Sequence, residues 1–196
     1  MTDTAAFTAA LRTAVQVAAD GCIVILGITP DKPETGYGYI RVAGDGDTAP
    51  AVARFVEKPD AATAARYLAE GGYFWNAGMF VLKASVWMAA LQRFRPDIAT
   101  ATRAAWAARS TDAKFVRPGK AEFTAVPSES VDYAVLEKCP GTDIPIRMVA
   151  LDAGWNDLGA WDAVWQVAPK DAQGNASVGD AIVKDSHNTL VHAHSR

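Results

Sequence analysis

The heptapeptide Cys-Ile-Val-Ile-Leu-Gly-Ile at residues 22–28 decides the fold class. It is short, apolar and rich in β-branched residues, which is typical of a strand buried on both faces, as in a parallel sheet. Just before it, apolar residues recur at helical spacing between Thr4, which can cap a helix, and Gly21, which can end one. A helix followed at once by a buried strand predicts an α/β fold.

Further along the chain, strands and helices continue to alternate. Residues 29–38 contain two prolines and two glycines and predict a loop, and residues 39–57 predict a hairpin. Asp60 is expected to cap a helix that ends near Gly71, and residues 73–82 predict another strand.

The second half of the chain has a weaker pattern. Ser85 predicts the start of a helix, residues 130–138 a short helix, residues 144–151 a strand and residues 160–167 a helix, whereas residues 108–127 are polar and poorly defined. The helix that starts at Ser85 has an apolar face formed by Trp87, Leu91, Phe94 and Ile98.

The composition shifts after Pro169, and residues 177–194 resemble short strands rich in Val, Asn and His. We therefore expect residues 1–172 to form one domain and residues 173–196 to begin a β-rich extension.

Composition excludes several classes of protein. Among 196 residues, 50% are apolar and 21% are charged, which excludes a disordered chain. The net charge of −3 leaves no basic surplus for a nucleic-acid backbone, so no nucleic-acid partner is expected. The apolar runs are too short to span a membrane, and residues 1–4 do not resemble a signal peptide. Cys22 and Cys139 form no disulfide or metal pattern, so we expect buried thiols and a cytoplasmic protein.

Two short segments could bind a sugar phosphate. Glycines in residues 34–39, Gly38 among them, would let the backbone approach a ligand closely, although a tight turn explains them equally well. In the sequence Phe-Val-Glu-Lys-Pro at residues 55–59, Glu57 can accept hydrogen bonds from hydroxyl groups and Lys58 can hold a phosphate. Adjacent strand residues point to opposite faces, so these two need not pair; the alternative is a solvated charge pair.

Two further polar residues stand out. Asn76 is one amide within an apolar segment, and it would either bind vicinal hydroxyls or bond to its own backbone at a bulge. Asp157 lies in a turn before a helix, where it would either cap the helix or act as one ligand of Mg²⁺.

Taken together and in order, five segments resemble the mannose-1-phosphate guanylyltransferases, also called GDP-mannose pyrophosphorylases, of the bacterial type often fused to a phosphomannose isomerase region. They are Thr-Pro-x-x-Pro-Glu-Thr-Gly-Tyr-Gly-Tyr-Ile (29–40), Phe-Val-Glu-Lys-Pro (55–59), Trp-Asn-Ala-Gly-Met-Phe (75–80), Ser-Val-Asp-Tyr-Ala-Val-Leu-Glu-Lys (130–138) and Gly-Trp-Asn-Asp-Leu-Gly-Ala-Trp (154–161).

This resemblance implies a Rossmann-like nucleotidyltransferase fold of the sugar-nucleotide, glycosyltransferase-A-like type. It also implies that GTP and mannose 1-phosphate react to give GDP-mannose and pyrophosphate with Mg²⁺. The resemblance also implies roles for single residues. Gly38 offers backbone contacts to the sugar, Glu57 and Asn76 bind its hydroxyls, and Asp132 is a further sugar-side contact. Lys58 binds the phosphate, and Asp157 is a Mg²⁺ ligand.

The sequence also departs from the family pattern. The signature Gly-Gly-x-Gly-x-Arg-Leu-Trp-Pro-Leu, which cradles the triphosphate, does not occur, and neither does the family's Ala-Asp-His segment. The resemblance therefore implies a chain truncated at both ends, with little GDP-mannose synthesis of its own. An uncovered sheet edge would then favour a homo-oligomer. Two alternatives stay open: another sugar-1-phosphate nucleotidyltransferase, or a non-catalytic module that binds sugar phosphates.

Overall fold

The computed structural model describes residues 1–44 and 46–194, and these fall into two compact units. The first unit comprises Thr2–Ala153, and the second comprises Met1 and the residues from Gly154 onward. The predicted boundary near residue 172 lies inside the second unit and stays a prediction about the family's domains. None of the helices within the described residues is long and apolar enough to cross a membrane.

The first unit is built on a five-stranded sheet of mixed direction, which confirms the α/β prediction. Its strand order is β3 (Val52–Val56), β2 (Tyr39–Val42), β4 (Tyr73–Val81), β1 (Ile23–Ile28) and β7 (Ile146–Ala150). The decisive segment, β1, is buried almost throughout. The predicted burial is confirmed, but the sheet is mixed and not purely parallel: β1 runs parallel to β7 and antiparallel to β4. A strand with two covered faces is apolar whichever way its neighbours run.

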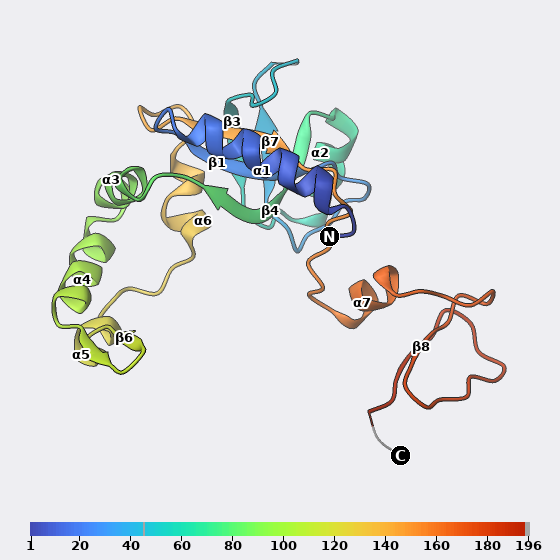
Figure 1. Ribbon diagram of the computed structural model, residues 1–196. Coiled ribbons are helices and arrows are strands. Elements are labelled where there is room, and N and C mark those ends of the chain that lie inside the picture. The colour runs from blue at the N-terminus through green and yellow to red at the C-terminus, as the bar shows by residue number, and fades with distance from the viewer. Residues whose placement is uncertain (45, 195–196) are drawn as a thin grey trace. The chain divides into compact units, whose positions relative to one another are not determined.

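One face of the sheet is covered by α1 (Thr4–Ala18), which contacts β1, β4 and β7 (Figure 1). Ala14 and Ala18 are buried there, and their small side chains let the helix approach closely. The predicted cap at Thr4 was wrong by one residue. Asp3 caps the helix, because its Oδ1 accepts a hydrogen bond from the Ala6 amide at 2.8 Å.

Beside α1, α2 (Ala61–Glu70) buries an aromatic cluster with β2 and β4. Tyr67 of the helix stacks on Tyr73 of β4 with ring centroids 4.0 Å apart. The predicted cap is confirmed, since Asp60 Oδ1 accepts a hydrogen bond from the Thr63 amide at 2.7 Å. Gly71 ends the helix in a left-handed conformation, also as predicted.

The opposite face of the sheet packs against α3 (Ala84–Phe94), α4 (Pro96–Ala107) and α6 (Val131–Ala134), followed by the 3₁₀ turn η1 (Leu136–Lys138). The single helix predicted from Ser85 was wrong. Pro96 cannot continue a helix and excludes helical geometry at Arg95, so a second helix begins at Pro96. Ser85 is not the cap either, because Lys83 precedes α3 and makes no capping bond.

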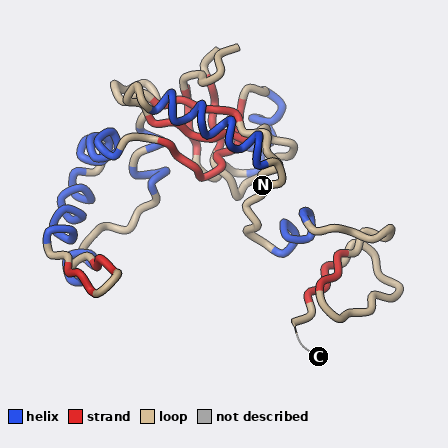
Figure 2. Tube along the Cα trace, viewed as in Figure 1, coloured by secondary structure: helices blue, strands red, loops and turns tan. Residues whose placement is uncertain are grey.

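The segment that the sequence left undefined forms a small hairpin and one short helix (Figure 2). The hairpin consists of β5 (Ser110–Asp112) and β6 (Phe115–Arg117), and α5 (Lys120–Thr124) follows it. Each strand has three residues, all exposed, so no alternation of buried and exposed side chains marks them in the sequence.

The second unit contains α7 (Trp161–Val167) and two short parallel strands, β8 (Ala176–Val178) and β9 (Leu190–His192). Asn175 is buried and joins its loops: its amide donates to Ser186 O at 2.9 Å and to Asp171 Oδ2 at 3.1 Å. Its Oδ1 accepts a hydrogen bond from the Thr189 amide. The strands expected after residue 173 are therefore present within the described residues, which end at residue 194.

Candidate functional site

Glu57 and Lys58 lie directly after the last residue of β3, and they form an ion pair. Lys58 Nζ lies 3.1 Å from Glu57 Oε1. The charge pair that the sequence left open as the alternative is therefore present. Lys58 lies beyond the strand and has a φ of +46°. This left-handed conformation breaks the alternation of the strand and brings the two side chains together.

The two partners of this ion pair differ in exposure. The side chain of Glu57 is only 9% exposed, whereas that of Lys58 is 59% exposed. Burial raises the pKa of the Glu57 carboxyl above its ordinary value, and the hydrogen bond from Lys58 opposes this rise. The same hydrogen bond and the charge of Glu57 raise the pKa of Lys58. A buried acceptor thus lies beside an exposed ammonium group that a phosphate can reach.

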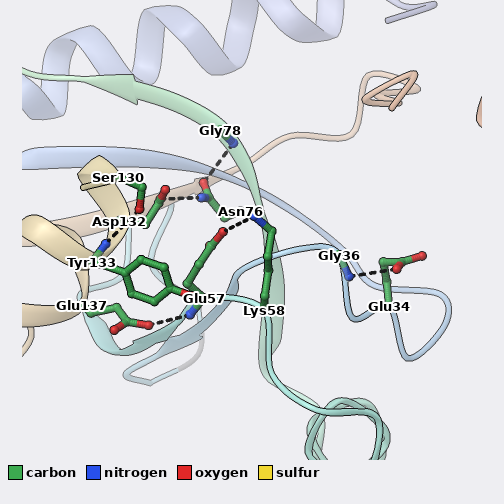
Figure 3. A network of polar contacts seen from close by, with 10 residues as sticks. All are labelled: Glu34, Gly36, Glu57, Lys58, Asn76, Gly78, Ser130, Asp132, Tyr133 and Glu137. Carbon is green, nitrogen blue, oxygen red and sulfur yellow. Dashed lines mark hydrogen bonds and ion pairs between the residues drawn. The ribbon is translucent and has the colours of Figure 1, made fainter. Parts of the chain in front are cut away.

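Asn76 and Asp132 meet beside this pair, although they lie on different elements (Figure 3). Asn76 Nδ2, on β4, donates to Asp132 Oδ1, on α6, at 3.2 Å. Asn76 Oδ1 also accepts a hydrogen bond from the Gly78 amide at 2.9 Å. The predicted bond of Asn76 to local backbone is therefore present, and Asn76 also contacts a second polar side chain; its binding of hydroxyl groups stays a prediction. Burial raises the pKa of Asp132, and the hydrogen bond from Asn76 opposes the rise.

Gly38 lies where these elements come closest. Its carbonyl accepts a hydrogen bond from the Asn76 amide at 2.7 Å. A Cβ atom at this position would lie 2.6 Å from Glu57 Oε2 and 3.3 Å from both Asn76 Cβ and Phe55 Cζ. Only a glycine fits without displacing these neighbours, which is a specific reason for glycine here and more than the freedom of a turn.

Glu137 is a member of this network that was not singled out in the sequence. Its Oε1 accepts a hydrogen bond from the Glu57 amide at 2.7 Å. The signal that could have found it is its place in the same quoted segment as Asp132, at residues 130–138. From the sequence alone, Glu137 is indistinguishable from an ordinary surface charge, because its contact with the Glu57 amide joins distant segments.

Asp157 belongs to the second unit, whereas the first unit gathers Gly38, Glu57, Lys58, Asn76 and Asp132. Asp157 does not cap α7, because Ala160 occupies the capping position and makes no side-chain bond. Its carboxylate lies over Gly159, where a Cβ atom would come within 2.7 Å of Asp157 Oδ2. Among the described residues, no group of three or more His, Cys, Asp or Glu side chains could hold a metal ion.

These features combine into one polar cluster where the chain leaves β3 and passes the middle of β4. It presents one ammonium group, a buried carboxylate, a second carboxylate and an amide side by side. Hydrogen-bond acceptors and donors of this kind bind sugar hydroxyls, and the ammonium binds a phosphate as a point charge. The arrangement holds no nucleophile activated by a base, so it fits a site that binds and orients substrates.

Comparisons with known proteins identify the family of the chain. The chain matches the Nucleotidyl transferase family over residues 1–174. It is 50% identical over 190 residues to the xanthan biosynthesis protein XanB of Xanthomonas campestris pv. campestris (strain B100), covering 97% of this chain and 40% of that protein. It is 46% identical over 188 residues to a mannose-1-phosphate guanylyltransferase of Escherichia coli, covering 94% of this chain and 39% of that protein.

A solved structure resembles the fold as well. The crystal structure described as mannose-1-phosphate geranyltransferase from Thermus thermophilus superposes with a TM-score of 0.77 at 31% identity. The superposition covers 91% of this chain and 50% of that one. The chain thus spans about two fifths of the length of the curated relatives named above. Its mixed sheet with helices on both faces is the Rossmann-like nucleotidyltransferase fold, and the chain belongs to the nucleotidyl transferase family.

Proposed function

We propose that this chain provides the sugar-phosphate site of a mannose-1-phosphate guanylyltransferase, which converts GTP and mannose 1-phosphate to GDP-mannose and pyrophosphate. The observation that carries the proposal is the Glu57–Lys58 pair joined to Asn76 and Asp132 around Gly38. The resemblance of the five sequence segments and the names of the relatives add support.

Each residue of the site has a distinct part in binding. The exposed ammonium of Lys58 attracts the phosphate of mannose 1-phosphate. The buried carboxylate of Glu57 accepts hydrogen bonds from sugar hydroxyls, and a charged acceptor makes such bonds stronger than a neutral one would. Asn76 and Asp132 contact further hydroxyls. Gly38 offers backbone contacts to the sugar, and its lack of a Cβ atom leaves room for the Glu57 carboxylate.

The reaction is a direct phosphoryl substitution. An oxygen of the sugar phosphate attacks the α-phosphorus of GTP, a new phosphorus–oxygen bond forms, and the bond between the α-phosphorus and the bridging oxygen breaks. Pyrophosphate leaves with that bonding pair. Catalysis of this kind depends on alignment and charge neutralisation, so the task of these residues is to hold the attacking phosphate in place.

The proposal includes a divalent metal ion, which enzymes of this family generally use, and we assign Mg²⁺. Mg²⁺ is commonly held by one or two carboxylates together with substrate phosphates, so the single carboxylate of Asp157 suits it. When bound, the ion would neutralise charge on the phosphate groups.

The proposal places the reaction in the cytoplasm, because both cysteines are buried free thiols, as in reducing compartments.

The test is calorimetric titration of the chain with mannose 1-phosphate and with GTP separately. We expect mannose 1-phosphate to bind, and we expect Lys58→Ala to weaken binding about tenfold, because the ammonium group that attracts the phosphate is lost. Lys114→Ala removes an exposed lysine of the hairpin turn and serves as the matched control.

The result also separates the alternatives. Binding of glucose 1-phosphate in preference to mannose 1-phosphate would indicate another sugar-1-phosphate nucleotidyltransferase. Binding of GTP in addition to the sugar phosphate would exclude a non-catalytic module that binds sugar phosphates alone. Absence of any sugar-phosphate binding by the folded chain would contradict the proposal.

A further inference from the structure

Lys58 has a backbone conformation that needs support from its surroundings. Its φ of +46° lies in the left-handed region, which disfavours residues with a Cβ atom. Such a conformation persists where neighbouring contacts hold it. Because this conformation also brings Lys58 Nζ to Glu57 Oε1, whatever holds the backbone here sets the geometry of the ion pair.

The sheet cannot provide that support. β3 is the outermost strand, and its pairing with β2 ends at Val56, opposite Tyr39. The amide of Glu57 lies just beyond this last pair, and it donates to the carboxylate of Glu137 at 2.7 Å. The side chain of Glu137 thus accepts the hydrogen bond of the Glu57 amide, at a position where no strand is paired with β3.

The segment that carries Glu137 is well anchored. Its neighbours Leu136 and Cys139 are each 1% exposed and belong to the main hydrophobic core. The same segment carries Asp132, which contacts Asn76 on β4. Residues 130–138 therefore connect the end of β3 to Asn76 within β4, the two strands that present the sugar-phosphate site (Figure 3).

We infer that Glu137 is a positioning residue: its hydrogen bond to the Glu57 amide fixes the backbone turn that joins Glu57 to Lys58 for binding the sugar phosphate. This inference rests on the proposed function for its ligand, but the hydrogen bond can be tested without one. Glu137 touches no substrate in this role, and its negative charge is not what the site uses.

The hydrogen bond from the Glu57 amide needs an oxygen acceptor at residue 137 but not a charge, so two substitutions of Glu137 can separate these properties. Glu137→Gln keeps an oxygen acceptor of the same length and removes the charge, whereas Glu137→Ala removes the acceptor. The charge of Glu137 raises the pKa of Glu57 and so opposes its ionised form. Glu137→Gln should therefore bind mannose 1-phosphate at least as tightly as the unchanged chain, and Glu137→Ala should bind it at least tenfold more weakly.

Amide hydrogen exchange provides the measurement that needs no substrate. In Glu137→Ala the Glu57 amide should exchange at least tenfold faster, while the Thr63 amide, which donates to Asp60, should be unchanged. Glu137→Gln should keep the Glu57 amide protected. Glu70→Ala removes an exposed carboxylate that pairs with Arg66, and it controls for general loss of negative charge.

The outcomes separate the inference from the proposed function. If the unchanged chain does not bind mannose 1-phosphate, the proposed function fails, and the exchange of the Glu57 amide still decides the positioning role. If Glu137→Ala retains both the protected amide and the affinity, the inference is overturned. It is also overturned if Glu137→Gln loses affinity as strongly as Glu137→Ala, because the charge rather than the hydrogen bond would then matter.

Discussion

At the scale of single residues, Gly38 shows how little space the site leaves. A Cβ atom in Gly38→Ala would meet Glu57 Oε2 at 2.6 Å, and the Glu57 carboxylate is held by Lys58. The substitution should therefore displace this carboxylate and weaken the binding of mannose 1-phosphate about tenfold in a calorimetric titration, roughly 1.4 kcal/mol.

A matched control lies two residues away in the same loop. In Gly36→Ala the added Cβ atom would meet only Glu34 Oε1, at 3.3 Å. The affinity of this variant should stay within twofold of the unchanged chain. Equal losses in both variants would show that the loop, and not the space beside Glu57, determines binding.

Glu57 also predicts a dependence of stability on pH. Burial raises the pKa of its carboxyl in the folded chain, so the folded chain holds this proton more tightly than the unfolded chain does. The resulting stabilisation is present at low pH and is lost as the pH rises through the folded pKa. Glu57→Gln should therefore raise the free energy of unfolding at pH 7.

Chemical denaturation at several pH values measures this effect. The advantage of Glu57→Gln should shrink as the pH falls below the range in which carboxyl groups titrate, because Glu57 is then protonated in both states. An advantage that stays constant from pH 4 to pH 8 would show that ionisation of Glu57 is not its source.

At the scale of secondary-structure elements, the second unit depends on one buried amide. Asn175 is 5% exposed and connects the loops before β8 and β9 through Asp171, Ser186 and Thr189. Asn175→Ala leaves buried backbone groups without partners, at a cost of about 1–3 kcal/mol. Faster hydrogen exchange of the Ala176 and Thr189 amides would report the loss.

The control for this change is Gln173→Ala, which removes an exposed side chain from the same loop. It should leave both amides protected. The first unit should keep the exchange pattern of its own amides in both variants, and a uniform loss of protection throughout the chain would contradict a local role for Asn175.

The secondary-structure elements also show which features local sequence patterns can predict. The cap at Asp60 and the helix end at Gly71 were predicted because each depends on residues within a few positions of one another. The hairpin at residues 39–57 was predicted because its two strands follow one another in the chain. The break between α3 and α4 was missed because the apolar spacing continues past Pro96 although the backbone cannot.

At the scale of the whole molecule, the residues assigned to the sugar phosphate and to the metal ion lie in different units. Five of them belong to the first unit, and Asp157 belongs to the second. Asp157→Asn should therefore leave the affinity for mannose 1-phosphate unchanged in a titration with EDTA, where Lys58→Ala still weakens it. A comparable loss in Asp157→Asn without metal would contradict the assignment of Asp157 as a metal ligand only.

The sequence by itself indicated the candidate groups of the proposed site. Gly38, Glu57, Lys58, Asn76 and Asp132 were identified from residue type, local spacing and resemblance, and the structure gathers all five in the first unit. The α/β class followed from the apolar segment at residues 22–28 and the helix before it. These features are local, so a reading of neighbouring residues can find them.

Only the tertiary structure decided how these groups interact. Lys58 pairs with Glu57 because its backbone turns into the left-handed region, which no nearby pattern indicates. Asp132 reaches Asn76 across 56 positions, and Glu137 reaches the Glu57 amide across 80. The directions of the strands beside β1 were decided in the same way. Contacts between distant segments depend on how the whole sheet assembles, and local spacing does not encode that assembly.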